Sequence, residues 1–159
     1  MDELRIRLAE LPDAAVIAGF NAAMAKETEH LELDADRLRA GVEAVLSDSS
    51  KGFYFVAEST GGVVGQLMIT FEWSDWRNGN FWWIQSVYVD TPARGSGVYK
   101  KLYTFVREAA AEAGNVCGIR LYVERDNTRA QEVYRRQGMH ATAYRIYEVD
   151  FVIGRRDTD

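Results

Sequence analysis

Residues Val87–Leu102 read VYVDTPARGSGVYKKL, the most informative stretch of the chain. Its first residues are β-branched or aromatic, as in a strand, and its last residues have helical spacing. The loop between them contains Gly95 and Gly97. Glycines let backbone N–H groups converge on an anion, and the unpaired amides at a helix N-terminus favour negative charge. The stretch therefore predicts a strand, a phosphate-binding loop and a helix.

The spacing of these glycines excludes two common phosphate loops. A P-loop needs Lys and then Ser or Thr directly after its last glycine, whereas Val98 and Tyr99 follow Gly97. The dinucleotide fingerprint G-x-G-x-x-G needs a third glycine where this chain has Lys100. On spacing alone, a glycine turn that only joins a strand to a helix is an equal alternative.

Composition bounds the class of protein. The chain has 159 residues, 47% of them apolar and 27% charged, which is typical of one globular domain, expected here over 1–153 with a polar tail at 154–159. Cys117 is the only cysteine, and only His30 and His140 accompany it. We therefore expect no disulfide, no metal site and a cytoplasmic location.

Charge and hydropathy exclude further classes. The net charge is −5, so sequence-independent binding to nucleic acid is not expected, and a cationic partner suits the chain better. No segment reaches the roughly 20 apolar residues of a membrane span, and the first residues do not resemble a secretory signal. We expect no association with a membrane.

The rest of the chain alternates strand-like and helix-like segments, which predicts an α/β fold. Apolar alternation or runs of aromatic and β-branched residues predict strands. Helical spacing after Pro12, after Asp34 and around Leu102 predicts helices. The expected strands are 4–8, 53–58, 63–73, 81–89, 118–124 and a last strand or strand pair within 141–152. A fourth helix is expected over 128–137, and Gly61-Gly62 and Asn78-Gly79 are expected to turn two hairpins.

The glycine loop resembles the central motif [QR]-x-x-G-x-[GA] of the GNAT superfamily of acetyl-CoA-dependent N-acetyltransferases. Arg94, Gly95, Ser96, Gly97, Val98 and Tyr99 occupy it in order, and Tyr99 stands where the family usually has Gly or Ala. The resemblance implies that backbone amides of this loop hold the diphosphate of coenzyme A. Arg94 could add a charge-assisted contact.

A second stretch resembles the family signature N-x-x-A-x-x-x-Y-x-x-x-G-[FM]. It is matched by Asn127, Ala130, Tyr134, Gly138 and Met139. The first three share one helical face. The resemblance implies that Asn127 contacts the pantetheine arm beside the small Ala130, and that Tyr134 protonates the leaving thiolate. Read from the residues alone, Asn127 is a helix cap and Tyr134 a core aromatic.

The resemblance implies a mixed, mainly antiparallel sheet of six to seven strands, flanked by about four helices, with a splay between the fourth and fifth strands. Acetyl-CoA would lie in this splay along Val87, Tyr88 and Val89. A backbone N–H near Val87 or Tyr88 would then polarise the thioester carbonyl.

The aromatic stretches 70–76 and 82–89 look most like the diamine and polyamine acetyltransferase branch. That branch often has Glu where this chain has Gln85, which leaves a water-mediated base for the amine. Glu27, Glu29 and Glu72 are candidates to attract a cationic amine, although each carboxylate alone is more often a solvated surface charge. Trp83 is a candidate to line the acceptor pocket.

The sequence therefore predicts a homodimeric enzyme that moves an acetyl group from acetyl-CoA to a primary amine of a small molecule by direct attack. Three alternatives are kept open. They are a non-catalytic module that binds CoA as a sensor or scaffold, an acetyltransferase for a protein or peptide amine, and a domain whose aromatic hairpin serves protein association.

Overall fold

The computed structural model describes residues 3–154. It forms two compact units, Met1–Leu121 and Tyr122–Asp159. The first unit contains the sheet and most of the helices, and the second contains the last helix and the C-terminal segment. The polar tail expected at 154–159 lies, beyond Gly154, outside the described residues.

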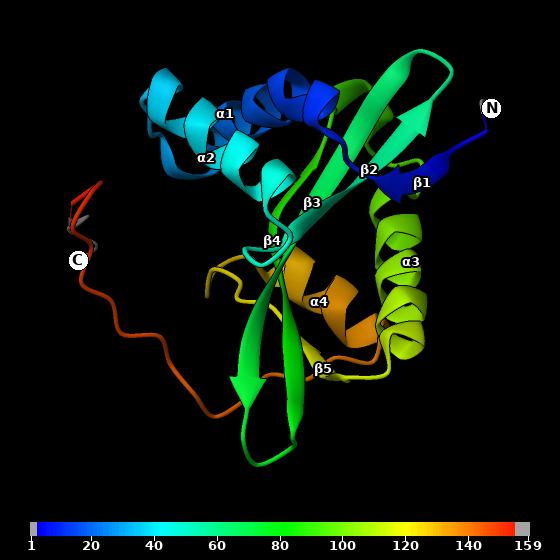
Figure 1. Ribbon diagram of the computed structural model, residues 1–159, viewed down its shortest axis with the longest axis vertical. Helices are drawn as coiled ribbons and strands as arrows, with labels where there is room; N and C mark the ends of the chain where they lie inside the picture. The colour runs from blue at the N-terminus through cyan, green and yellow to red at the C-terminus, as the bar shows by residue number, and fades with distance from the viewer. Residues whose placement is uncertain (1–2, 155–159) are drawn as a thin grey trace. The chain divides into compact units, whose positions relative to one another are not determined.

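One five-stranded sheet forms the first unit (Figure 1). Its strands follow chain order, and they are β1 (Arg5–Leu8), β2 (Phe53–Ser59), β3 (Gly62–Ser74), β4 (Gly79–Val89) and β5 (Val116–Arg120). The first four pair antiparallel and β5 pairs parallel to β4. The expectation of a mixed, mainly antiparallel sheet is confirmed, and β5 lies earlier in the chain than the predicted 118–124.

Four α-helices occur among the described residues, as expected. They are α1 (Ala14–Glu29), α2 (Ala35–Ser47), α3 (Val98–Ala113) and α4 (Thr128–Arg136), with short 3-10 turns at Leu11–Asp13 and Thr91–Ala93. Local chemistry sets their ends. Asp34 caps α2, because its Oδ1 accepts from the backbone N–H of Arg37 at 2.8 Å. Gly114 ends α3 in the left-handed conformation at φ 77°.

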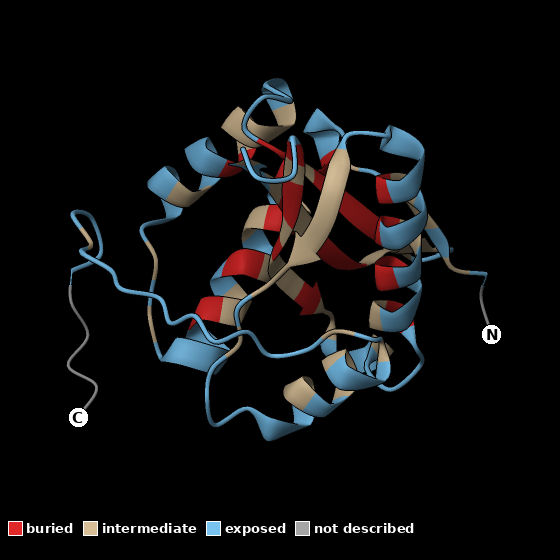
Figure 2. Cartoon of the chain, turned by 90° about the horizontal axis from the view of Figure 1, so that it is seen from below, coloured by how far each residue is buried: buried red, intermediate tan, exposed pale blue. Residues whose placement is uncertain are grey.

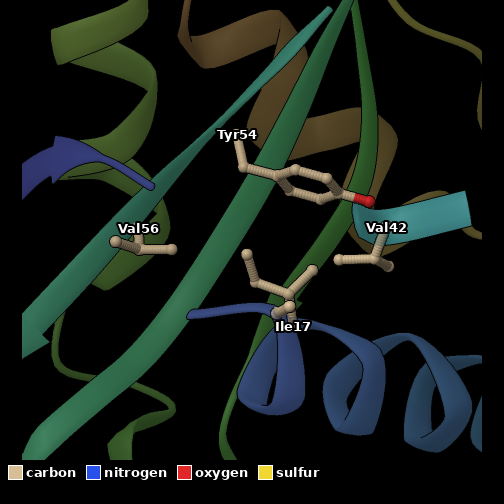
Figure 3. Packing of buried hydrophobic residues seen from close by; sticks show 5 residues of the cluster. Ile17, Val42, Tyr54 and Val56 are labelled. Atoms are coloured by element: carbon tan, nitrogen blue, oxygen red, sulfur yellow. The ribbon is translucent and has the colours of Figure 1, made fainter. Parts of the chain in front are cut away.

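The core of the first unit lies on both faces of the sheet. On one face, Ile17 of α1 and Val42 of α2 pack with Tyr54 and Val56 of β2 (Figure 3). Phe55 points to the opposite face because side chains alternate along a strand. The centroid of its ring lies 5.0 Å from the ring centroid of Phe105 in α3. The buried residues drawn red in Figure 2 mark this two-sided packing.

The last expected strand, within 141–152, is absent, so the prediction of six to seven strands was wrong for the described residues. Between α4 and Gly154 no residue lies in a strand, and the side chains of Tyr147 and Phe151 are both 93% exposed. Alternating apolar residues make a segment able to form a strand, but a strand also needs a partner for its backbone N–H and C=O groups.

A bulge interrupts β4 close to its end. Gln66 pairs with Tyr88 and Met68 pairs with Gln85, so the single residue Leu67 faces both Ser86 and Val87. Ser86 adopts φ 51°, an uncommon conformation for a residue other than glycine. Such bulges bend the strand and change the direction of the following residues.

A buried polar network holds this bulge. The Nε2 of Gln66 donates to the carbonyl oxygen of Ser86 at 3.1 Å and to Oδ1 of Asn21 at 2.9 Å. The Nδ2 of Asn21 in turn donates to the hydroxyl of Tyr54 at 3.3 Å. Gln66 and Asn21 are both buried, so each bond satisfies a polar group that water does not reach.

Ile17→Ala should destabilise the protein strongly, because Ile17 is fully buried between α1 and the sheet. We expect a loss of about 2–5 kcal/mol in the free energy of unfolding, measured by urea denaturation. Leu11→Ala is the matched control, since Leu11 is 54% exposed and its truncation should cost much less. Equal losses for the two variants would contradict the packing described for α1.

Gln66→Leu should also destabilise the protein, because Oδ1 of Asn21 and the carbonyl of Ser86 would each lose a buried donor. We expect a loss of about 1–3 kcal/mol in urea denaturation. Asn21→Leu should cost a similar amount, and the double variant should cost less than the sum of the two single ones. Strict additivity would show that the two side chains are not coupled.

Candidate functional site

The first unit presents an open strand edge at the end of β4. Its parallel pairing with β5 runs from Asn80 to Trp83, where Trp83 pairs with Arg120, the last residue of β5. Strand β4 continues to Val89, and β3 pairs with it there on the other side. Within residues 3–154, no strand pairs with residues 84–89 on the β5 side. This is the expected splay between the fourth and fifth strands.

The glycine loop follows this open edge after the short 3-10 turn Thr91–Ala93. Gly95 and Gly97 both adopt φ 83°, and a Cβ built on either residue would meet no atom within 4 Å. Gly97 is also the N-cap of α3 and offers no side chain to the first amides of that helix. The hydroxyl of Ser96 donates instead to the carbonyl of Ala93 at 2.6 Å. The uncapped helix start and the open glycines suit an anion bound through backbone amides.

Arg94 is anchored within the protein. Its Nη2 lies 2.9 Å from Oε2 of Glu27 near the end of α1, and its Nε donates to the carbonyl of Val89 at 2.8 Å. The guanidinium also lies over the ring of Tyr88, 5.3 Å from the centroid. These contacts hold the loop against both α1 and the last residue of β4.

Tyr88 completes this cluster. Its hydroxyl donates to Oε1 of Glu27 at 3.2 Å, and its ring lies 5.0 Å from that of Phe20. The hydrogen bond from Arg94 lowers the pKa of Glu27, and burial raises the pKa of Tyr88. Glu27 therefore stays ionised at neutral pH. The structure thus places Glu27, which was expected to bind the amine, against Arg94 of the expected phosphate loop.

A polar row lies on one face of the sheet beside the open edge. Gln85 and Trp83 of β4 share this face, and the Nε2 of Gln85 donates to the hydroxyl of Thr70 in β3. The indole N–H of Trp83 donates to Oε1 of Glu72 at 3.3 Å. The same carboxylate oxygen lies 2.6 Å from Nη1 of Arg120.

Glu72 is therefore part of an ion pair, as Glu27 is. Arg120 also covers the ring of Phe81 at 3.6 Å from its centroid, so the guanidinium is held from two sides. Glu29, the last residue of α1, is exposed. Of the three carboxylates expected to attract an amine, two thus have an arginine partner.

The second unit carries the second motif on α4. Asn127 is the N-cap of this helix, because its Oδ1 accepts from the backbone N–H of Ala130 at 3.1 Å. The alternative that Asn127 caps a helix is thus observed, and its Nδ2 is not used in that bond. Burial raises the pKa of Tyr134 above its ordinary value, so its phenol is protonated at neutral pH.

Tyr99 occupies the first turn of α3. Its ring lies 6.3 Å from that of Tyr103, one helical turn later, and its hydroxyl is buried. The substitution of Gly or Ala by Tyr at this motif position is therefore accommodated with the side chain packed. The backbone of the turn keeps its helical conformation.

Sequence reasoning missed Gln66, Asn21 and Arg120. A signal exists for the first two, because Gln66 interrupts an apolar strand and Asn21 lies on the apolar face of α1 one turn after Ile17. Polar residues at apolar positions indicate a buried network. Arg120 had no such signal, because its partner Glu72 lies far away in the chain and only the sheet register joins them.

Residues 3–154 contain no group of three or more His, Cys, Asp or Glu side chains placed to hold a metal ion. None of the described helices is long and apolar enough to cross a membrane. Cys117 of β5 is half-buried and has a free thiol.

Comparison with known proteins agrees with this geometry. The model of the acetyltransferase (GNAT) family matches residues 17–139. No curated protein sequence matched the chain. A solved structure of a possible acetyltransferase from Clostridium difficile 630 is 45% identical, with a TM-score of 0.87, over 94% of this chain and 98% of that one.

Two other solved structures share the fold at lower identity. A predicted acetyltransferase with acetyl-CoA from Clostridium acetobutylicum is 17% identical, with a TM-score of 0.75, over 94% of this chain and 97% of that one. An aminoglycoside N-acetyltransferase in complex with CoA is 17% identical, with a TM-score of 0.74, over 95% of this chain and 97% of that one. The family model covers most of the chain, and the first structure is closely similar in sequence, so the chain belongs to the acetyltransferase (GNAT) family.

Proposed function

We propose that the protein transfers the acetyl group of acetyl-CoA to a primary amine of a small molecule by direct attack. One observation carries this proposal. The open backbone edge of β4 leads, through the short 3-10 turn Thr91–Ala93, into a loop of left-handed glycines at an uncapped helix start. An extended ligand that ends in a diphosphate fits this sequence of features, because it needs strand-like hydrogen bonds first and converging amides next.

Relatives support the choice of ligand. The structures from Clostridium acetobutylicum and of the aminoglycoside enzyme contain acetyl-CoA and CoA respectively, and both share the fold of this chain. In the present chain, the amides at the start of α3 would hold the diphosphate, with Gly95 and Gly97 leaving it room. Ser96, Val98 and Tyr99 would contribute backbone only, since the Ser96 hydroxyl is already bonded to Ala93.

The β4 bulge supplies a donor for the reaction. Negative charge develops on the thioester oxygen when the amine attacks, and a backbone N–H aimed at that oxygen stabilises it. A bulge residue is displaced from the regular ladder, so its N–H can face a ligand at the open edge. We assign this role to Val87 or Tyr88, and the network through Gln66 keeps the bulge in place.

The amine must reach the thioester as a free base, and its ordinary pKa is about 10.4. Gln85 has no useful basicity, so the proton leaves the amine through water. The Nε2 of Gln85 is bonded to Thr70, so its Oε1 is the atom that would accept from an amine N–H. Trp83 beside it offers an aromatic face to an ammonium group. Glu27, Glu29 and Glu72 are candidates to attract the ammonium form of the amine, although Arg94 already pairs with Glu27 and Arg120 with Glu72.

Collapse of the addition product breaks the carbon–sulfur bond, and the sulfur leaves with the electron pair. A thiolate needs a proton at this point, and we assign Tyr134 as its donor. Burial keeps its pKa above the ordinary value, so the phenol holds its proton until the thiolate forms. Asn127 would contact the pantetheine amides through Nδ2, and Ala130 is small enough to let the arm pass.

A second candidate function is a non-catalytic module that binds CoA. It is favoured by Gln85, which replaces a basic carboxylate, and by Tyr99 in the first turn of α3. An acetyltransferase for a protein or peptide amine would use the same coenzyme groove and differ only on the acceptor side.

Calorimetry with CoA, followed by thiol-release assays with acetyl-CoA, separates these functions. We expect saturable CoA binding, and turnover with at least one member of a panel of diamines, amino acids, aminoglycosides and N-terminal peptides. Gly97→Val should abolish the binding, since a β-branched residue is strained at φ 83°. Binding without turnover on any amine would favour the sensor, and absence of CoA binding would overturn both functions.

Tyr134→Phe should lower kcat by on the order of 10²-fold, because removal of a general acid typically costs this much. The affinity for acetyl-CoA, measured by calorimetry, should change little, since the ring is kept. Tyr103→Phe is a control, because Tyr103 is a buried tyrosine of α3 outside the motif. An unchanged kcat in Tyr134→Phe would remove this residue as the acid.

A further inference from the structure

Ser86 has a backbone conformation that neither its residue type nor its place in a strand favours. Three described residues other than glycine have a positive φ, and they are His30, Asn78 and Ser86. His30 ends α1 and Asn78 lies in the β3–β4 turn, and His and Asn adopt this conformation more readily than most residues. Ser86, at φ 51°, is the first bulge residue of β4, where a residue with positive φ is ordinarily glycine.

The contacts that hold Ser86 lie within the first unit. Its carbonyl accepts from Nε2 of Gln66 at 3.1 Å. Its side chain interacts with the hydroxyl of Tyr54, to which Nδ2 of Asn21 also donates. Glycine would adopt the same φ without strain, but it has no side chain to reach Tyr54. The side-chain contact therefore explains a serine at this position.

The network around Ser86 has a cost in stability. Oε1 of Gln66 is buried and has no hydrogen-bond partner among residues 3–154. The amide of Gln66 cannot turn over to satisfy it, because its oxygen would then face the carbonyl of Ser86. A strained backbone and an unsatisfied buried acceptor thus meet at one point of β4. Such costs concentrate at functional sites.

The direction of the Val87 N–H follows from the same contacts. The carbonyl of Ser86 and the N–H of Val87 belong to one planar trans peptide unit, so they point in opposite directions. Gln66 of β3 holds the carbonyl, which directs the N–H away from β3 toward the open edge. The alternation along the strand agrees, because the N–H of Asp90, three residues later, donates to Val64 in β3.

The extra residue also decides which side chains share a face of the sheet. Gln85 pairs with Met68 and Tyr88 pairs with Gln66, and the two β3 residues share a face because they are two positions apart. Gln85 and Tyr88 therefore share that face, although three positions along a regular strand would separate them. The bulge thus places Gln85 and the hydrogen-bonded pair of Tyr88 and Glu27 on one side of the sheet.

We propose that Ser86 is a positioning residue for acetyl transfer, an inference that rests on the proposed function. Its left-handed backbone keeps the N–H of Val87 aimed at the oxygen of the thioester. That oxygen gains negative charge when the amine attacks, so the aim of the donor affects the transition state more than it affects coenzyme binding. The strain at Ser86 then serves the reaction.

Infrared spectroscopy of acetyl-CoA with an isotopic label at the thioester carbonyl tests the aim of this N–H. A hydrogen bond to the carbonyl oxygen lowers its stretching frequency, so the label should absorb at lower frequency when bound to the parent protein than when free. Ser86→Gly should remove most of this downshift and leave the affinity for acetyl-CoA, measured by calorimetry, nearly unchanged. Its urea midpoint should not fall by much, because glycine relieves the backbone strain.

Kinetics with an amine that supports turnover give a second measurement. Ser86→Gly should lower kcat by roughly 10- to 100-fold with a smaller change in the KM for acetyl-CoA, since outright removal of such a donor costs about 10²–10³-fold. Asn78→Gly is the matched control. It relieves the same kind of strain, at φ 49°, in the hairpin turn and should change neither kcat nor the downshift.

Tyr54→Phe keeps the serine and removes the hydroxyl that its side chain contacts, so it should weaken the same downshift and decides the question if Ser86→Gly does not fold. A parent protein that binds acetyl-CoA without a downshift would overturn the positioning role. A downshift or a kcat that is unchanged in Ser86→Gly would overturn it too, and both results leave the proposed function standing. Absence of acetyl-CoA binding by the parent protein would overturn the proposed function and this role together.

Discussion

The backbone pairing of β4 differs between its two edges, and this difference positions the candidate site. Along one edge β4 pairs with β3 as far as Val89, whereas along the other it pairs with β5 only as far as Trp83. The strand is therefore rigid enough to aim its final residues and still has N–H and C=O groups for a ligand. A central strand with two full partners would offer no binding edge, and a strand with one partner throughout would be less well fixed.

The bulge and the glycine loop both follow from this constraint. Strand β4 changes direction at Ser86 and Val87, and Gln66 holds that change through the carbonyl of Ser86. Arg94 then bonds to the carbonyl of Val89, so the loop begins from a fixed point. Each element takes its position from the end of the previous one, which explains why a buried glutamine and an arginine matter to the position of the glycine loop.

Charge is distributed in pairs across the candidate site. Arg94 faces Glu27 at the loop, and Arg120 faces Glu72 on the sheet. The chain is acidic overall, but these two carboxylates are already compensated, so they attract a cationic amine less than their number suggests. An arginine that is bonded to a carboxylate has to break that bond before it can contact a phosphate. The bond lost and the bond gained are both charge-assisted hydrogen bonds. Under the proposed function, a diphosphate would therefore depend mainly on backbone amides, consistent with the two glycines and the uncapped start of α3.

Sequence patterns were reliable where a local rule sets the structure. The glycines of the loop, the Asp34 cap and the aromatic strands each act within a few residues, and the order of elements follows from them. The ion pairs of Arg94 and Arg120 and the coupling of Gln66 to Asn21 join residues far apart in the chain, so spacing alone had no means of pairing them.

The segment after α4 shows the limit of such patterns most clearly. Its alternation predicts a strand, and the described structure contains none there, although the residues are as suited to a strand as those of β4. A pattern reports the capacity of a segment to pair, whereas pairing itself is a property of two segments. The pattern at 141–152 therefore identifies a segment that is able to form a strand, but it does not identify the strand with which that segment would pair.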